Sequence, residues 1–386
     1  MSVQHKENSS RLVTFRDVEN VGPGTLAGDY LRLFWQPVFH SHDLDVGQAK
    51  PIRILGEDFT LYRGESGDPF IVASRCAHRG MPMHAGWVED DEIRCFYHGW
   101  KYNGAGQCIE QPGEPKPFCD RVQITSHPTR EYLGLIFAYF GPGEPPEFPR
   151  YPKFEGDEWL LAIDSYVRPC HFFNNLENAC DTVHVGWAHH TTETFDNQVD
   201  DFPEIFAEEK DWGAEMVAVR PNGKKVVSQF AMPNLFLIRG VPDDPEVGYR
   251  EFFAWWVPHD DNRHTQFTVA KKAKDDPTTD RYMKRRAEKL AQQDLDHESL
   301  ARAILAGEIG WNDIDPKRVN LTIVQDHVAQ IGVGLMAERE EVLGLSDRGV
   351  SMCRQLWVTE LQKLADGEPL TDWRIDLEKF AASAEY

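Results

Sequence analysis

The chain has 386 residues, of which 63 are acidic and 41 basic, giving a formal net charge of −22. Because a single hydrophobic core rarely grows past about 250–300 residues, this length predicts two domains. Hydrophobic residues make up 41% of the chain and aromatic residues 11%, a composition that excludes a disordered protein. The negative charge repels phosphate backbones and anionic lipids, so we expect neither nucleic acid nor a membrane as a partner.

The sequence carries no sign of membrane insertion or secretion. No apolar run reaches the roughly 18 residues that a membrane helix needs, and the opening MSVQHKENSSRLV lacks the apolar core of a signal peptide. The seven cysteines are odd in number and have no spacing typical of a disulfide framework. We therefore expect a soluble, cytoplasmic protein.

Strand-like runs separated by turns extend from about residue 51 to 140, a pattern typical of a small all-β domain. The proline- and glycine-rich segment 141–156 is the best candidate linker. After it come a polar helix over 172–190, long antiparallel strands, charged helices and a mostly helical tail. The predicted fold class is α+β, divided as follows: an N-terminal extension over 1–33, an all-β domain over 34–150 and an antiparallel-sheet and helix domain over 151–386.

The first constellation of chemically active residues is Cys76, His78, Cys95 and His98, which form C-x-H and C-x-x-H clamps 16 residues apart. Two cysteines and two histidines can hold a structural zinc. They can also hold a [2Fe–2S] cluster, in which each clamp supplies one ligand to each iron. Imidazole in place of two thiolates raises the reduction potential to roughly −150 to +300 mV. A glycine after each clamp lets the backbone approach the sulfides, so we favour the cluster.

The second constellation is D-x-x-H-x-x-x-x-H, made by Asp181, His184 and His189. Residues five apart on a helix diverge by about 140°, so the helix must distort or end for both imidazoles to bind one metal. Gly186 makes a distortion there plausible, and His190 is a rival to His189. Two histidines and one carboxylate on one face of Fe(II) leave adjacent coordination positions open for oxygen and substrate.

Together the two constellations resemble the terminal oxygenase (α) subunits of Rieske non-haem iron oxygenases. The phrases GWVEDDEIRCFYHGWKYNGAGQCIEQPGEP, WWVPHDD and LGLSDRG resemble the phthalate-dioxygenase-like branch, which also includes aromatic O- and N-demethylases. The resemblance implies an N-terminal Rieske [2Fe–2S] domain and a helix-grip-like catalytic domain that binds mononuclear Fe(II).

The resemblance assigns Asp181 to a bridge between His98 of one subunit and His184 of its neighbour, so the third iron ligand must be another acid. We expect Asp326, which lies in the apolar helical pattern LTIVQDHVAQIG, because a buried acid without a partner costs several kcal/mol. Three other residues stay open for that ligand: His327, Asp313 and Asp315. Two residues of the polar helix are expected to orient the ligands: Glu177 and Asn178.

The implied assembly is a homotrimer in which the cluster of one subunit serves the mononuclear iron of the next. The implied reaction uses O2 to hydroxylate or oxidatively demethylate a small aromatic compound. No G-x-G-x-x-G follows a strand, so NAD(P)H is expected to act through a separate flavin and iron–sulfur reductase, directly or through a ferredoxin. The rival interpretations are a Rieske-type electron carrier and a zinc-stabilised protein that binds a hydrophobic ligand.

Overall fold

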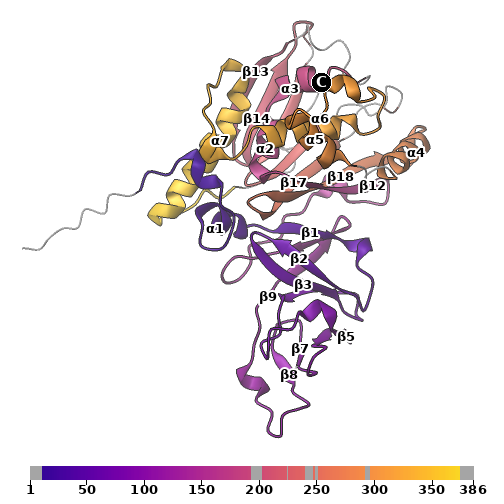
Figure 1. The fold of residues 1–386 in the computed structure, drawn as a ribbon, viewed down its shortest axis with the longest axis vertical. Helices are drawn as coiled ribbons and strands as arrows, with labels where there is room; N and C mark the ends of the chain where they lie inside the picture. Colours follow the sequence, from indigo (N-terminus) through magenta and orange to yellow (C-terminus); the bar gives the residue numbers. More distant parts are fainter. Residues whose placement is uncertain are drawn as a thin grey trace, which may run out of the picture.

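The computed structural model of the chain describes residues 11–192, 202–223, 225–239, 247, 251–291 and 296–373. The molecule is elongated, and its two halves follow the chain order (Figure 1). Small sheets of the N-terminal half occupy one end, and helices α3 and α6 lie at the other end beyond a large sheet.

Three small antiparallel sheets build the N-terminal half. The tight turn between β2 and β3 places Leu55 and Gly56 at φ values of 52° and 80°, the left-handed conformation that suits a two-residue hairpin. The strands of the first sheet, in spatial order, are β1 (Gln36–His40), β11 (Leu135–Ala138) and β10 (Thr129–Tyr132). Those of the second sheet are β2 (Ala49–Ile54), β3 (Glu57–Arg63), β4 (Pro69–Ala73) and β9 (Ser126–His127). Those of the third sheet are β5 (Trp87–Glu89), β6 (Glu92–Arg94), β7 (Lys101–Tyr102) and β8 (Cys108–Glu110).

The C-terminal half is built on one seven-stranded antiparallel sheet. Its strands in spatial order are β12 (Trp159–Arg168), β18 (Arg263–Ala273), β17 (Glu251–Asp260), β16 (Leu235–Arg239), β15 (Lys225–Ala231), β14 (Gly213–Val219) and β13 (Glu204–Lys210). Successive side chains of a strand point to opposite faces. Trp255 faces the N-terminal half, where its ring lies 5.8 Å from that of Phe137, and the neighbouring Trp256 points to the other face, where its ring lies 5.2 Å from that of Phe236.

The helices are α1 (Leu26–Arg32), α2 (Phe172–Cys180), α3 (Thr182–Ala188), α4 (Thr279–Leu290), α5 (His297–Leu305), α6 (Leu321–Gly332) and α7 (Arg348–Asp366). Helix α1 packs on α7, with the Tyr30 and Trp357 rings 5.4 Å apart and both side chains fully buried. One continuous hydrophobic core therefore joins the first residues of the described chain to its last helix.

The α+β fold class is confirmed, whereas the domain boundaries near residues 33 and 150 stay predictions. Two local expectations are wrong. The single helix expected over 172–190 is two helices that meet at Asp181, because that residue caps both. The run EIRCFYHGWKY is two strands, β6 and β7, with the second Cys–His clamp in the turn between them. Within the described ranges, no helix is long and apolar enough to cross a membrane.

Candidate metal centres

The two loops that carry the Cys–His clamps have the same backbone conformation. In each loop the cysteine N–H (Cys76, Cys95) donates to the carbonyl five residues ahead, at 2.9 and 2.8 Å. The N–H of the glycine four residues ahead (Gly80, Gly99) donates back to the cysteine carbonyl, at 2.9 and 3.0 Å. Both glycines have a left-handed φ, 72° and 75°, which a residue with a side chain adopts only with strain. The two clamps are therefore equivalent knuckles.

The loops bring like ligands together. Cys76 and Cys95 are 3% and 2% exposed. Burial raises the pKa of the Cys95 thiol, and a hydrogen bond with the Cys76 thiol raises it further. The His78 and His98 rings lie 4.5 Å apart, and the buried Nδ1 of His78 has no hydrogen-bond partner within the described chain. Two thiols form one pair and two imidazoles form another.

This pairing separates the two metal interpretations. A tetrahedral zinc holds all its ligand atoms about 3.3–3.8 Å from one another. Across the described residues, two groups of three or more ligand atoms lie within 4.8 Å, and neither contains Cys76 or Cys95. A two-iron cluster needs the thiolates on one iron and the imidazoles on the other. The donor set therefore fits a Rieske [2Fe–2S] cluster better than a single zinc.

The second constellation lies where α2 meets α3. Asp181 ends α2 and caps α3, its Oδ1 accepting hydrogen bonds from two N–H groups of the first turn at 2.9 and 3.2 Å. Helix α3 then ends directly before His189. The distortion expected at Gly186 is not observed, because Gly186 lies inside α3. The helix end, not the glycine, lets the His184 and His189 rings approach to 5.4 Å.

Asp326 of α6 completes a group with these histidines. One ligand atom each from His184, His189 and Asp326 lies within 4.8 Å of the others, and His189 Nε2 is 3.3 Å from Asp326 Oδ1. Burial alone would raise the pKa of Asp326, but the hydrogen bond and the charge of His189 lower it to about 2. Burial lowers the pKa of His189, but the hydrogen bond and the negative charge of Asp326 raise it by more, so the pKa is raised overall. The two residues form an ion pair that a metal cation can replace.

The alternatives left open by the sequence lie apart from this group. His190 is exposed, and its Nδ1 is 2.5 Å from the Trp187 carbonyl oxygen. His327 is buried beside Asp326 in the sequence but contributes no atom to the group. The other two candidate acids are exposed and accept hydrogen bonds from nearby backbone N–H groups: Asp313 and Asp315.

The residues expected to orient the ligands divide in two. Asn178 lies beside Asp326, and its Nδ2 donates to Oδ1 at 3.2 Å. Glu177 differs from the expectation: its carboxylate pairs with Arg339, at 2.7 Å, and with Arg354. It therefore joins α2 to the C-terminal segments and contacts no metal-ligand candidate.

Two supporting residues were missed from the sequence. Gln325 Oε1 lies 2.9 Å from His189 Nδ1 and fixes the orientation of that ring. Gln325 directly precedes Asp326, and a polar residue beside the acid in that apolar run could have indicated a supporting role. The Tyr102 hydroxyl lies 3.3 Å from Cys76 Sγ. No local pattern marks it, because β7 brings it to the thiol from 26 residues away.

Comparison with known proteins finds a Rieske domain and relatives that are oxygenase subunits. The Rieske [2Fe-2S] domain family matches residues 34–128. The chain is 30% identical over 360 residues to the 5,5'-dehydrodivanillate O-demethylase oxygenase subunit of Sphingobium sp., covering 90% of this chain and 80% of that protein. It is 27% identical over 376 residues to the phthalate 4,5-dioxygenase oxygenase subunit of Pseudomonas putida, covering 88% and 84%.

Solved structures show the same fold. The terminal oxygenase of carbazole 1,9a-dioxygenase from Novosphingobium sp. has a TM-score of 0.63 at 20% identity, over 86% of this chain and 94% of that one. An oxygenase and ferredoxin complex of carbazole 1,9a-dioxygenase has a TM-score of 0.61 at 18% identity, over 87% of this chain and 94% of that one.

The fold and the two centres define an iron-dependent oxygenase component. The chain belongs to the Rieske non-haem iron oxygenases, as a terminal oxygenase (α) subunit of the type found in aromatic-compound oxygenases. It is therefore an oxidoreductase whose cofactors are a Rieske [2Fe–2S] cluster and a mononuclear iron and whose co-substrate is O2.

Proposed function

We propose that this oxygenase hydroxylates or oxidatively demethylates a small aromatic compound. In this proposal His184, His189 and Asp326 hold the mononuclear iron, and the cluster ligands are Cys76, His78, Cys95 and His98. The observation that carries it is the gathering of two histidines and one carboxylate within 4.8 Å in the same chain as the two equivalent Cys–His knuckles. The names of the relatives support the substrate class, since they include an O-demethylase and a dioxygenase of aromatic compounds.

When bound, the mononuclear iron supplies oxygen activation, and the cluster supplies electrons one at a time. The chain's own residues prepare the ligands. Gln325 Oε1 accepts a hydrogen bond from His189 Nδ1–H, so a bound metal would take the place of the proton on Nε2, the nitrogen that faces Asp326. Asn178 holds the Asp326 carboxylate from the other side. Two histidines and one carboxylate would hold the iron and leave coordination positions for oxygen and substrate.

A cavity beside the site is large enough for an aromatic ring. Its volume is about 650 Å³, and its wall includes Trp187, Trp311 and Gln325, the residue that holds His189. Pockets of this size with apolar walls and few polar groups are typical of small-molecule sites. We therefore place the aromatic substrate or its entry path there.

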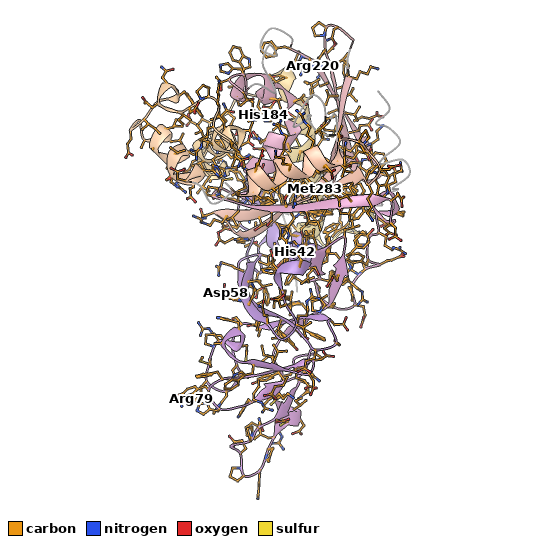
Figure 2. The ribbon with its side chains drawn as sticks, turned by 90° about the vertical axis from the view of Figure 1, so that its right-hand side faces the viewer. His42, Asp58, Arg79, His184, Arg220 and Met283 are labelled. Carbon is orange, nitrogen blue, oxygen red and sulfur yellow. The ribbon has the colours of Figure 1, made fainter. Side chains whose placement is uncertain are left out.

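The two centres lie at opposite ends of one chain. Figure 2 shows Arg79, in the first knuckle, far along the molecule from His184. An electron then has no short path within one subunit, which supports a homotrimer with Asp181 at the bridge between subunits. Exposed rings are found at both ends, with Trp87, Phe96 and Trp187 51%, 55% and 56% exposed. Surfaces of this kind mark protein interfaces.

The electrons are proposed to come from a separate NAD(P)H-dependent flavin and iron–sulfur reductase, directly or through a ferredoxin. The sequence supports this because no dinucleotide-binding motif follows a strand. The solved oxygenase and ferredoxin complex of carbazole 1,9a-dioxygenase supports it by showing such a partner on a protein of the same fold.

The test is iron and acid-labile sulfide content of protein purified without oxygen, compared with Asp326→Asn. We expect about three iron and two sulfide per chain in the wild type and about two and two in the variant, because the amide is a weaker iron ligand. Asp313→Asn, an exposed acid outside the group, should match the wild type. A full iron content in Asp326→Asn would show that another residue is the third iron ligand. Zinc without sulfide in the wild type would indicate a zinc-stabilised protein that binds a hydrophobic ligand.

The reaction itself is tested by turnover of the reconstituted system with methoxylated and unmethylated aromatic acids. Formaldehyde release from the former indicates demethylation, and a ring hydroxyl on the latter indicates hydroxylation. Turnover of neither class, with both metal centres loaded, would contradict the proposed substrate class.

A further inference from the structure

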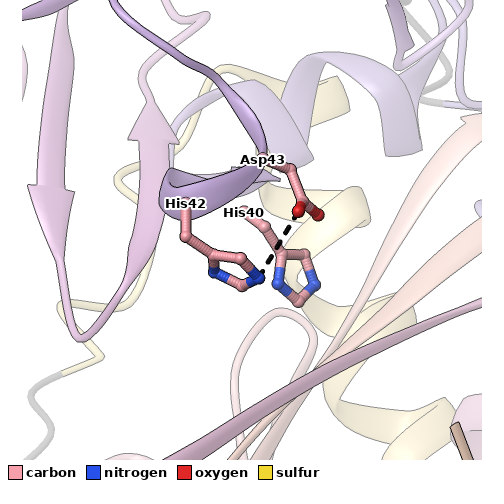
Figure 3. A group of neighbouring side chains, drawn as sticks. All are labelled: His40, His42 and Asp43. Atoms are coloured by element: carbon pink, nitrogen blue, oxygen red, sulfur yellow. Dashed lines mark ion pairs between the residues drawn. The ribbon is translucent and has the colours of Figure 1, made fainter.

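A second group of metal-ligating side chains lies at the corner that follows β1. Figure 3 shows His40, at the end of β1, with His42 and Asp43 of the short helix η2 (Ser41–Asp43). One ligand atom from each lies within 4.8 Å of the other two. In the described part of the chain, the one other group of this kind is the mononuclear site. The oxygenase reaction uses none of these three residues.

The decisive residue is His40. It is 8% exposed, and neither ring nitrogen has a hydrogen-bond partner in the described chain. Its ring packs against Phe267 of β18 with the centroids 6.0 Å apart, and against His42 at 5.2 Å. More than nine-tenths of buried polar groups in proteins are hydrogen-bonded, so two unpartnered nitrogens on one buried ring require an explanation.

The other two residues complete a donor set of the right size. His42 Nε2 and Asp43 Oδ1 are 3.4 Å apart, within the roughly 3.3–3.6 Å that separates two ligand atoms of one tetrahedral zinc. Their side chains are 64% and 57% exposed, so a metal can reach the group from solvent. An ordinary surface ion pair explains these two residues but leaves His40 unexplained.

The surroundings of His40 permit a cation. Burial lowers the pKa of His40, which favours the neutral ring that binds metals. Two charged groups of the C-terminal half are close enough to influence it, Asp164 and Arg286. These two form an ion pair, with Arg286 Nη2 2.6 Å from Asp164 Oδ1, and they act on the pKa of His40 in opposite directions.

We propose that His40, His42 and Asp43 form a binding site for an exchangeable divalent transition metal, with Zn²⁺ as the best-fitting ion. Two imidazoles and one carboxylate suit zinc, nickel or copper, whereas Mg²⁺ and Ca²⁺ prefer all-oxygen ligands. Three protein ligands leave a position for water, so the metal exchanges with solvent. Because His40 also packs on β18, the bound metal stabilises the contact between the two halves of the chain.

The test uses the iron-loaded holoenzyme, dialysed without oxygen against ZnCl2 and analysed for zinc, iron and sulfide. His42→Ala and Asp43→Asn should each bind one zinc fewer per chain than the wild type, with equal iron and sulfide. Both side chains are exposed, so the variants are expected to fold. Zinc can also replace the mononuclear iron, but it does so equally in the wild type and the variants. This zinc therefore does not affect the difference in zinc content between them.

Asp45→Asn is the matched control, since it removes an equal charge from the same exposed corner outside the group. It should bind as much zinc as the wild type. Zinc should also raise the melting temperature of the wild type and of Asp45→Asn but of neither site variant, and CaCl2 should raise none of them. Equal zinc content in the wild type and both site variants, or an equal effect of calcium, would overturn the site. Neither outcome depends on turnover, so failure here is separate from failure of the proposed oxygenase reaction.

Discussion

At the scale of single residues, Asp181 has two roles that one mutation can separate. Its Oδ1 caps α3 by accepting two backbone hydrogen bonds, and it positions His184 three residues later. In the proposed trimer its negative charge also bridges to His98 of the neighbouring subunit. Asparagine caps a helix as well as aspartate does, but it carries no charge.

Asp181→Asn should therefore retain both metal centres and lose electron transfer. We expect unchanged iron and sulfide, and at least about a tenfold slower reoxidation of the reduced cluster with substrate and O2, because a hydrogen bond to a charged group contributes about 1.5–3 kcal/mol. Stopped-flow absorbance of the cluster measures this rate. Asp347→Asn, at the N-cap position of α7, is the control, and normal transfer in Asp181→Asn would contradict the bridging role of Asp181.

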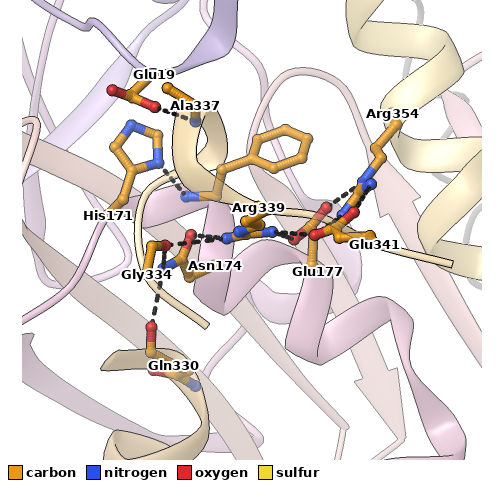
Figure 4. A network of polar contacts seen from close by, with 11 residues as sticks. Glu19, His171, Asn174, Glu177, Gln330, Gly334, Ala337, Arg339, Glu341 and Arg354 are labelled. Carbon is orange, nitrogen blue, oxygen red and sulfur yellow. Dashed lines mark hydrogen bonds and ion pairs between the residues drawn. The ribbon is translucent and has the colours of Figure 1, made fainter. Parts of the chain in front are cut away.

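At the scale of elements, a buried ionic network joins α2, the segment after α6, and α7 (Figure 4). Arg339 donates to Glu177 at 2.7 Å and to Asn174, and Arg354 pairs with both Glu177 and Glu341. The side chains of Arg339 and Glu177 are 6% and 10% exposed. Removing one partner of such a pair leaves an uncompensated buried charge.

Arg339→Met should lower the free energy of unfolding by about 3 kcal/mol at pH 7, because it leaves Glu177 with one arginine. Arg150→Met is the matched control. It breaks the exposed pair with Glu155, in which the arginine side chain is 69% exposed, and should cost less than about 1 kcal/mol. Denaturant unfolding of the holoenzyme measures both, and equal losses would mean that the network contributes no more than a surface pair.

The loss of unfolding free energy in Arg339→Met should be smaller in acid. Hydrogen bonds and charge from Arg354 first, and from Arg339 after it, hold the pKa of Glu341 below its usual value of 4.5, and the part due to Arg339 is lost in the variant. A lowered folded-state pKa gives stability that is complete above about pH 4.5 and is lost as the pH falls through the folded value. The difference between wild type and Arg339→Met is therefore expected to be smaller at pH 4 than at pH 7. A difference that grows in acid would contradict this assignment.

At the scale of the whole molecule, the separation of the two centres makes subunit mixing informative. In the proposed assignment His98→Asn removes a cluster ligand and Asp326→Asn removes an iron ligand, so each variant should be inactive as a homotrimer. Trimers that contain both chains should regain about a third of wild-type activity, because in a mixed cyclic trimer one subunit contact in three joins an intact cluster to an intact iron site. Purified mixed trimers with two different tags give this measurement. No activity in the mixture would place electron transfer within one chain.

The sequence alone predicted the fold class, the family and the equivalent Cys–His clamps. It could do so because those features depend on short spacings, where a few peptide bonds limit how far side chains can separate. The same reasoning failed within the polar helix, where the break falls at Asp181 and not at Gly186. A side chain that caps its own backbone competes with the helix, and helical periodicity does not report that competition.

What the tertiary structure decided is which distant residues meet. Asp326 had rivals in Asp313, Asp315 and His327 until the packing of α6 on α3 brought its carboxylate to 3.3 Å from His189. Gln325 reaches the same ring across 136 residues, and the buried ring of His40 packs against Phe267 of β18, a residue far away in the sequence. Local spacing fixes neither contact, since both depend on how sheets and helices bury their apolar faces against one another. The sequence by itself therefore determined the chemistry of this protein, and the packing determined which side chains are in place to carry it out.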